Sequence, residues 1–250
     1  MVDRFLENPN LPQNNASYVV MSDDKPEIIV ELLNNYHVSI ITPKPLDHIS
    51  GAEKYHADMC LCHLGGNKFL ADSGNTDMIH LMSGLGAEIN RCEGISAEMP
   101  KLNVCFLDDK VICNVKKTDS AIIEYCNRNY IKLLHTNQSY AKCSTAIVSK
   151  NAVITSDPSI YKVCRENDID VLKISHGHIM LEGYDYGFIG GTCGLLNKNT
   201  IVFSGNISLH KDYENIKAFA ANYGVDIVSL GNEPLYDIGG ILPIIEKLQN

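Results

Sequence analysis

One pattern recurs four times along the chain, and this repeat constrains the fold more than any other feature. Each copy reads as a strand, a tight polar turn, a second strand, a capped amphipathic helix and a third strand. The turns lie 43, 41 and 48 residues apart, at Gly66, Asp109, Lys150 and Lys198. A period of roughly 20–50 residues is typical of arrays, solenoids and propellers, in which each unit buries its hydrophobic face against a neighbour. The repeat therefore predicts an α/β protein assembled from similar units.

The two ends of the chain read as halves of a fifth unit. Residues 235–245, LYDIGGILPII, resemble an opening strand, but no helix and strand follow them. Residues 17–42 supply a strand, a helix that begins near Pro26 and another strand. Joined across the termini, these segments complete the unit, and such closure removes exposed sheet edges. We therefore expect residues 1–250 to form one domain, a closed five-fold pseudosymmetric α/β propeller of ββαβ repeats, with residues near Val19 paired to those near Ile241.

Charge and composition narrow the classes of partner. The formal net charge is −9 and no basic run occurs, whereas phosphate binding needs clustered Lys and Arg, so we expect no nucleic acid partner. The N-terminus lacks the apolar core of a signal peptide, and no segment has the length of a membrane helix. We therefore expect a cytoplasmic protein with no membrane partner. The nine cysteines are scattered through predicted strands and helices, which favours buried thiols over disulfides.

Five strand–strand–helix–strand units closed in a ring resemble the pentein fold, and the resemblance covers nearly the whole chain. Its enzymes modify guanidino groups and include arginine deiminases, dimethylarginine hydrolases, agmatine deiminases and amidinotransferases. The same fold is similar to that of an archaeal and eukaryotic translation initiation factor that has no catalytic role. The resemblance thus implies either a thiol-dependent enzyme for guanidino compounds or a non-catalytic binding protein.

The resemblance also assigns the key groups of the enzymes to positions in this sequence. In the enzymes a nucleophilic cysteine follows a glycine-rich stretch of the last unit, a histidine opens a middle unit, and carboxylates hold the guanidinium nitrogens. The last unit here contains Asp237-Ile238-Gly239-Gly240, which maps the nucleophile to Gly239. Lys142 stands near the histidine position, at the opening of the third unit. The usual cysteine and histidine are therefore both absent from their expected places.

Cys193 is the candidate nucleophile that the sequence offers instead. It lies in the glycine-rich start of the fourth unit, GGTCG, where a ligand can approach the backbone closely. An irregular insertion, SHGHIMLEGYDYG, directly precedes this unit and contains His176, His178, Glu182 and Asp185. Because a thiolate and an imidazole form a recognised nucleophilic pair, we expect the catalytic residues to be Cys193, His178, His176 and Glu182. The alternative is that Cys193 is a small buried strand residue.

Charged side chains near the unit starts are candidates for ligand binding, because these starts point toward the central channel. The expected ligand-binding residues are Asp58, Lys142, Asp185, Asp237 and Gly239. Carboxylates that converge on a channel suit an amine or guanidinium cation, whereas the alternative is that these residues form a solvated rim. The His-Gly-His segment and the segment from Cys60 to His63 resemble metal-ligand spacing, but no CxxC pair or HExxH helix exists, so we expect no metal.

The sequence thus favours a small-molecule site on the propeller axis, with thiol-dependent hydrolysis of an amino-acid-like or guanidino compound as the leading hypothesis. A non-catalytic binding protein on the same scaffold is the rival. A third class, a doubly wound sheet that binds a cofactor through its loops, ranks last because the chain has no GxGxxG or P-loop pattern. We accordingly expect a small-molecule ligand and no cofactor, and the oligomeric state stays open.

Overall fold

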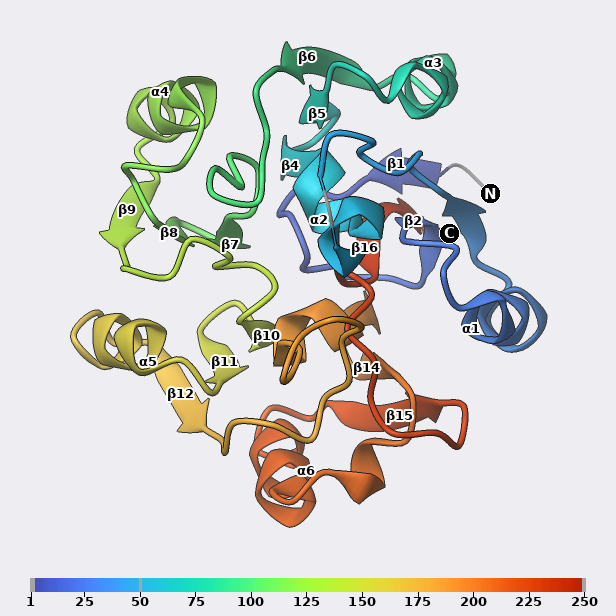
Figure 1. Cartoon of the computed structure of the whole chain (residues 1–250), viewed down its shortest axis with the longest axis vertical. Coiled ribbons are helices and arrows are strands. Elements are labelled where there is room, and N and C mark those ends of the chain that lie inside the picture. Colours follow the sequence, from blue (N-terminus) through green and yellow to red (C-terminus); the bar gives the residue numbers. More distant parts are fainter. Residues whose placement is uncertain (1–2, 50, 249–250) are drawn as a thin grey trace.

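The predicted order of strand, turn, strand, helix and strand is confirmed in all four copies. The computed structural model describes residues 3–49 and 51–248, and Figure 1 shows its elements. The four copies comprise β4 (Leu61–Gly65), β5 (Lys68–Asp72), α3 (Thr76–Gly84) and β6 (Glu88–Cys92); β7 (Cys105–Leu107), β8 (Lys110–Cys113), α4 (Ser120–Arg128) and β9 (Lys132–His135); β10 (Ala146–Ser149), β11 (Ala152–Thr155), α5 (Pro158–Arg165) and β12 (Asp170–Lys173); and β13 (Cys193–Asn197), β14 (Thr200–Ser204), α6 (Tyr213–Ala221) and β15 (Asp226–Leu230).

Each copy forms its own three-stranded sheet. The first two strands pair antiparallel across the predicted turn, and the second strand pairs parallel with the third, as β5 does with β6. Parallel pairing needs a crossover connection, and the amphipathic helix of each unit supplies it. The helix starts follow the sequence signals: the Asp157 carboxylate accepts hydrogen bonds from the backbone N–H groups of Ser159 and Ile160, and Asp119 caps α4 in the same way.

The fifth sheet joins the two ends of the chain. Its strand order is β1-β16-β2-β3, and the expected pairing near Val19 is confirmed, because Val19 lies opposite Pro243 and Val20 opposite Leu242. Strand β1 was not expected, because it is only three residues long and polar. The elements of this sheet are β1 (Asp3–Phe5), β2 (Ala16–Val20), α1 (Pro26–Glu31) with the π-helical turn Leu32–Tyr36, β3 (Ser39–Ile41) and β16 (Leu242–Lys247).

The five sheets lie around a common centre, with α1 and α3–α6 on the outside (Figure 1). No strand pairing joins one sheet to the next among residues 3–49 and 51–248, so the fold is a mixed α/β arrangement of five small sheets and not one closed sheet. Three short helical turns lie between the units, η2 (Ala52–Tyr55), α2 (Ala57–Cys60) and η3 (Ile189–Thr192), and a fourth, η4 (Ile207–Leu209), lies within the last unit between β14 and α6. Among the described helices, none has the length and apolar character needed to cross a membrane.

A buried carboxylate holds the fifth sheet together. Glu246 in β16 is 1% exposed, and its Oε1 accepts a hydrogen bond of 2.9 Å from Arg4 Nε in β1. The backbone N–H groups of Gln13 and Asn14 donate to Oε2, each at 2.7 Å. The Glu246 side chain, which belongs to β16, therefore holds β1 and the segment around Gln13 against this strand.

Replacing this carboxylate by its isosteric amide tests how much the closure depends on it. In Glu246→Gln one acceptor oxygen becomes an NH₂ donor that faces N–H groups, and we expect the free energy of unfolding to fall by about 1–3 kcal/mol. Urea unfolding followed by circular dichroism measures this. The control Glu124→Gln, which removes an exposed pair with Arg128, is expected to change stability by less than about 0.5 kcal/mol. Equal stability of the two variants would contradict this account of Glu246.

Candidate functional site

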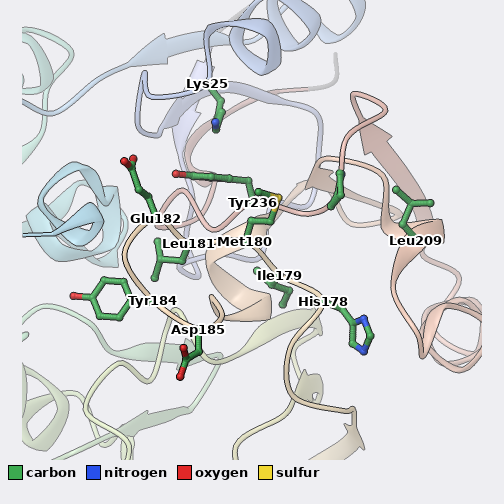
Figure 2. A pocket seen from close by; sticks show the side chains of 11 residues that line it. Lys25, His178, Ile179, Met180, Leu181, Glu182, Tyr184, Asp185, Leu209 and Tyr236 are labelled. Carbon is green, nitrogen blue, oxygen red and sulfur yellow. The ribbon is translucent and has the colours of Figure 1, made fainter.

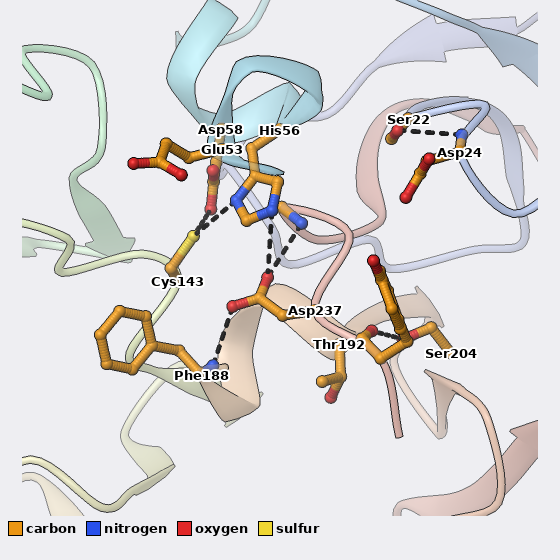
Figure 3. A network of polar contacts seen from close by, with 12 residues as sticks. Ser22, Asp24, Glu53, His56, Asp58, Cys143, Phe188, Thr192, Ser204 and Asp237 are labelled. Carbon is orange, nitrogen blue, oxygen red and sulfur yellow. Dashed lines mark hydrogen bonds and ion pairs between the residues drawn. The ribbon is translucent and has the colours of Figure 1, made fainter. Parts of the chain in front are cut away.

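A thiol, an imidazole and two carboxylates meet at the centre of the molecule, and all four side chains are buried. The Cys143 thiol donates to Asp58 Oδ2 across 2.7 Å, and its Sγ lies 3.8 Å from His56 Nδ1. On the other side of the imidazole ring, His56 Nε2 lies 3.7 Å from Asp237 Oδ1. Figure 3 shows the ring placed between Cys143 and Asp237. Three segments that are far apart in the sequence thus build one cluster.

Backbone contacts hold the members of this cluster in place. The Asn103 side chain accepts hydrogen bonds from the backbone N–H groups of Lys142 and Cys143, at 2.9 and 3.1 Å, and its Nδ2 lies 3.5 Å from the Cys143 sulfur. Asp237 accepts from the backbone N–H groups of Phe188 and Gly239, at 2.8 and 3.0 Å. The sulfur and this carboxylate are therefore positioned before any ligand arrives.

His56, Cys143 and Asp237 form the floor of a cavity of about 330 Å³, which we call the Cys143 cavity, whereas Asp58 lines a separate small cavity together with Lys142. The acidic lining residues of the Cys143 cavity are Glu53, Glu98 and Asp237, and four aromatic side chains form much of its wall: Tyr140, Tyr184, Tyr186 and Phe188. The Tyr184 hydroxyl donates to Glu53 Oε1. Within the described part of the chain, no Lys or Arg side chain lines this cavity.

Burial controls the electrostatics of the floor. It raises the pKa of Asp58 to about 6, although the neighbouring His56 and Lys142 favour the charged form. Burial, together with the charges of Asp58 and Asp237, raises the pKa of the Cys143 thiol well above its usual range. The thiol is therefore protonated in the resting protein. Three buried polar atoms at the site have no hydrogen-bond partner among the described residues: Glu53 Oε2, His56 Nε2 and Asp58 Oδ1.

Gly239 lies in this site, but its position has no room for a side chain. Its φ of +74° favours glycine, and a Cβ at this position would lie 2.3 Å from the His56 Cβ. The position to which the resemblance maps a cysteine is thus a glycine, and His56, from the connection between η2 and α2 that precedes the first unit, lies against it. Lys142 points elsewhere: its Nζ donates to the Gly190 carbonyl at 3.2 Å, and it lines two small cavities together with Asn10 and Pro243.

Cys193 lies in β13, where it and Lys142 line the smaller of these two cavities, with a volume of about 10 Å³. The side chain is 2% exposed, and burial raises its pKa to about 12. His178, Glu182 and Asp185 line a different, open cavity of about 700 Å³, which we call the His178 cavity (Figure 2). His176 lies against Tyr186 instead, with the ring centres 5.6 Å apart. No hydrogen bond within the described residues joins Cys193 to either histidine.

Sequence reasoning missed His56 and Cys143 as functional residues. Cys143 directly follows Lys142, which the mapping did single out, and His56 stands two residues before Asp58. Of the segment from Cys60 to His63, Cys60 ends the helical turn α2, and the other three residues belong to β4. His56, Cys143 and Asp237 each offer an atom that could bind a metal ion, and these atoms lie within 4.8 Å of one another. This donor set is of the kind that zinc prefers.

Comparison of the structure with solved structures identifies the fold. An inosamine-phosphate amidinotransferase from Streptomyces griseus matches with a TM-score of 0.57 and 10% identity, over 91% of this chain and 92% of that one. The dimethylarginine dimethylaminohydrolase from Pseudomonas aeruginosa, solved as a Cys-to-Ser variant with citrulline, has a TM-score of 0.55 and 10% identity over 86% and 92%. Agmatine deiminase from C. jejuni has a TM-score of 0.53 and 10% identity over 92% and 90%.

These proteins belong to the pentein superfamily, so the expected resemblance in fold is confirmed. No curated protein matches the sequence. The model of a family described as a family of unknown function, DUF6873, matches residues 20–242. The chain therefore belongs to this family, and its structure has the pentein-like arrangement of five small α/β units.

Proposed function

We propose that the Cys143 cavity binds a small cation with a planar amidine or guanidine group, and that Cys143 attacks its central carbon in a thiol-dependent hydrolysis of a C–N bond. The observation that carries the proposal is the contact of one thiol with a carboxylate and an imidazole at the floor of an acidic cavity. A nucleophile beside groups that can accept its proton is the arrangement of a covalent catalyst. Similar proteins that act on amidino or guanidino compounds, such as agmatine deiminase, add support.

The charges of the site favour a cationic ligand. Buried carboxylates are costly unless they are paired, and the Oε2 atom of Glu53, which lines the cavity, has no partner among the described residues. The N–H groups of an amidinium are suited to pair with carboxylates in a planar geometry. A cavity of about 330 Å³ lies within the range of small-molecule sites.

The chemistry follows from the contacts of Cys143. Its thiol proton passes to Asp58 Oδ2, and the sulfur forms a bond to the ligand carbon while Asp237 and Glu53 hold the nitrogens. The C–N bond to the leaving amine then breaks, and the amine departs with the proton from Asp58. Water adds to the same carbon, the C–S bond breaks, and the thiol is restored. His56, between the sulfur and Asp237, is placed to accept and return the proton of this water.

Ligand charge couples binding to activation of the thiol. In the resting protein, burial and two carboxylates keep Cys143 protonated. A cation bound beside the sulfur favours the thiolate, because an opposite charge within about 4–6 Å stabilises the ionised form. Neutral electrophiles do not provide this charge, so the proposed nucleophile discriminates between cationic and neutral reagents.

The architecture proposed with this function is a single closed five-fold propeller of residues 1–250, with the ligand site on its axis. The pairing of β16 with β2 and the placement of the sheets around one centre support it (Figure 1).

A non-catalytic binding protein on the same scaffold is the second candidate. It is favoured by the glycine at position 239 and by the raised pKa of the Cys143 thiol.

A matched pair of alkylating reagents distinguishes the proposed hydrolase from the non-catalytic binding protein. 2-Chloroacetamidine is a cation and 2-chloroacetamide is its neutral analogue; both transfer a carbon to sulfur with loss of chloride. Normalised to their reaction with a free thiol, we expect the amidine to modify Cys143 at least about tenfold faster at neutral pH. Mass spectrometry of the digested protein identifies the modified cysteine.

Cys143→Ser is expected to abolish rapid labelling, whereas Cys193→Ser is expected to leave it unchanged. Labelling of Cys193 in place of Cys143 would show that the reactive thiol is Cys193, the residue expected from the sequence. If both reagents leave every cysteine unmodified in the native protein, this result contradicts the proposed hydrolase and favours the non-catalytic binding protein.

The raised pKa of Asp58 predicts a pH dependence of stability. The native protein binds this proton more tightly than the unfolded chain, so the stability it contributes is present below pH 4 and is lost as the pH rises through about 6. Relative to Asp58→Asn, which cannot ionise, the free energy of unfolding of the unmodified protein should fall by roughly 2–3 kcal/mol between pH 4 and 7. Urea unfolding at several pH values measures this, with the exposed Asp226→Asn as control. If the free energies of unfolding of Asp58→Asn and the parent protein differ by the same amount from pH 4 to pH 7, the predicted pH dependence is refuted.

A further inference from the structure

Apart from the His56 imidazole, the ionisable groups with the strongest charge in the lining of the Cys143 cavity are carboxylates. Asp237 lies at the buried floor, Glu53 is buried in the wall, and Glu98 is exposed, which places its carboxylate where the cavity meets solvent. A cationic ligand thus finds carboxylates at both ends of the cavity. A ligand carboxylate finds only like charges, which are unfavourable when brought together in a desolvated site.

Three lysines that lie close in sequence to residues of the lining are engaged elsewhere. Lys54 Nζ lies 4.8 Å from the centre of a neighbouring tyrosine ring. Lys101 Nζ donates to the backbone carbonyl of Glu93 at 2.6 Å, and Lys142 Nζ donates to that of Gly190 on the far side of the floor. None of the three lines the cavity, so none is in place to bind a ligand carboxylate.

The wall between floor and mouth is aromatic. The ring centres of Tyr140 and Tyr186 lie 6.3 and 6.4 Å from that of Phe188, and Tyr184 is tied to Glu53 by its hydroxyl. Aromatic faces attract cations and pack against alkyl chains. A chain that carries a positive group at each end therefore matches the cavity along its whole depth.

We infer that the Cys143 cavity selects doubly cationic ligands without a carboxylate, that is, guanidino or amidino amines and not guanidino amino acids, and that Glu98 holds the second positive group. This inference rests on the proposed function, because it names the substrate class of the same site. Glu98 is then a specificity-determining residue at the mouth, remote from the reacting sulfur.

Three probes of equal chain length test the inference by calorimetric titration of the intact protein. They are 4-guanidinobutylamine, which has two positive groups; butylguanidine, which has one; and arginine, which adds a carboxylate. We expect 4-guanidinobutylamine to bind about tenfold or more tightly than butylguanidine, and arginine to bind most weakly.

The variant Glu98→Gln is expected to bring the affinities of 4-guanidinobutylamine and butylguanidine to within about twofold of each other. The matched control is Glu214→Gln on α6, an exposed carboxylate at the outside of the fold, which should leave the order unchanged. Arginine binding as tightly as 4-guanidinobutylamine, or an unchanged preference in Glu98→Gln, would overturn the inference and leave the proposed function standing. Failure of all three probes to bind would overturn both.

Discussion

The antiparallel pairing of β16 with β2 is the interaction on which the rest of the structure depends. It returns the end of the chain to the sheet that its beginning forms, and Glu246 connects both ends through Arg4 and the backbone near Gln13. Because Asp237 lies just before β16, this pairing also fixes the carboxylate opposite the His56 ring. The pairing that joins the two ends of the chain therefore also completes the cluster at the centre.

The cluster contains the kinds of group that the resemblance implies, but on residues other than the mapped ones. The mapped nucleophile position is Gly239, and the space where its side chain would lie is filled by His56, from the connection that precedes the first unit. The sulfur comes from Cys143, beside Lys142, the residue near the expected histidine position. A thiol, an imidazole and carboxylates thus meet at the centre of the molecule although each of the two expected positions holds a different residue. The positions of the units, more than the identity of any one residue, determine what meets there.

The repeat made most of the fold predictable, because hydrophobic spacing, turn residues and caps such as Asp157 are local signals. Strand β1 escaped prediction because its pairing rests on a distant partner, Glu246, and not on its own apolar pattern. The site was only partly predictable. Asp58 and Asp237 were expected from their places at unit starts, but the contact of His56 with Cys143 joins residues 87 positions apart. Sequence spacing carries no signal for such a contact.

A crystal structure of the protein soaked with guanidinium at neutral pH tests the central claim most directly. The account predicts one planar cation at the floor of the Cys143 cavity, hydrogen-bonded to Asp237 and in contact with the Cys143 sulfur. An empty Cys143 cavity at saturating guanidinium, or a cation bound only in the His178 cavity, would contradict it.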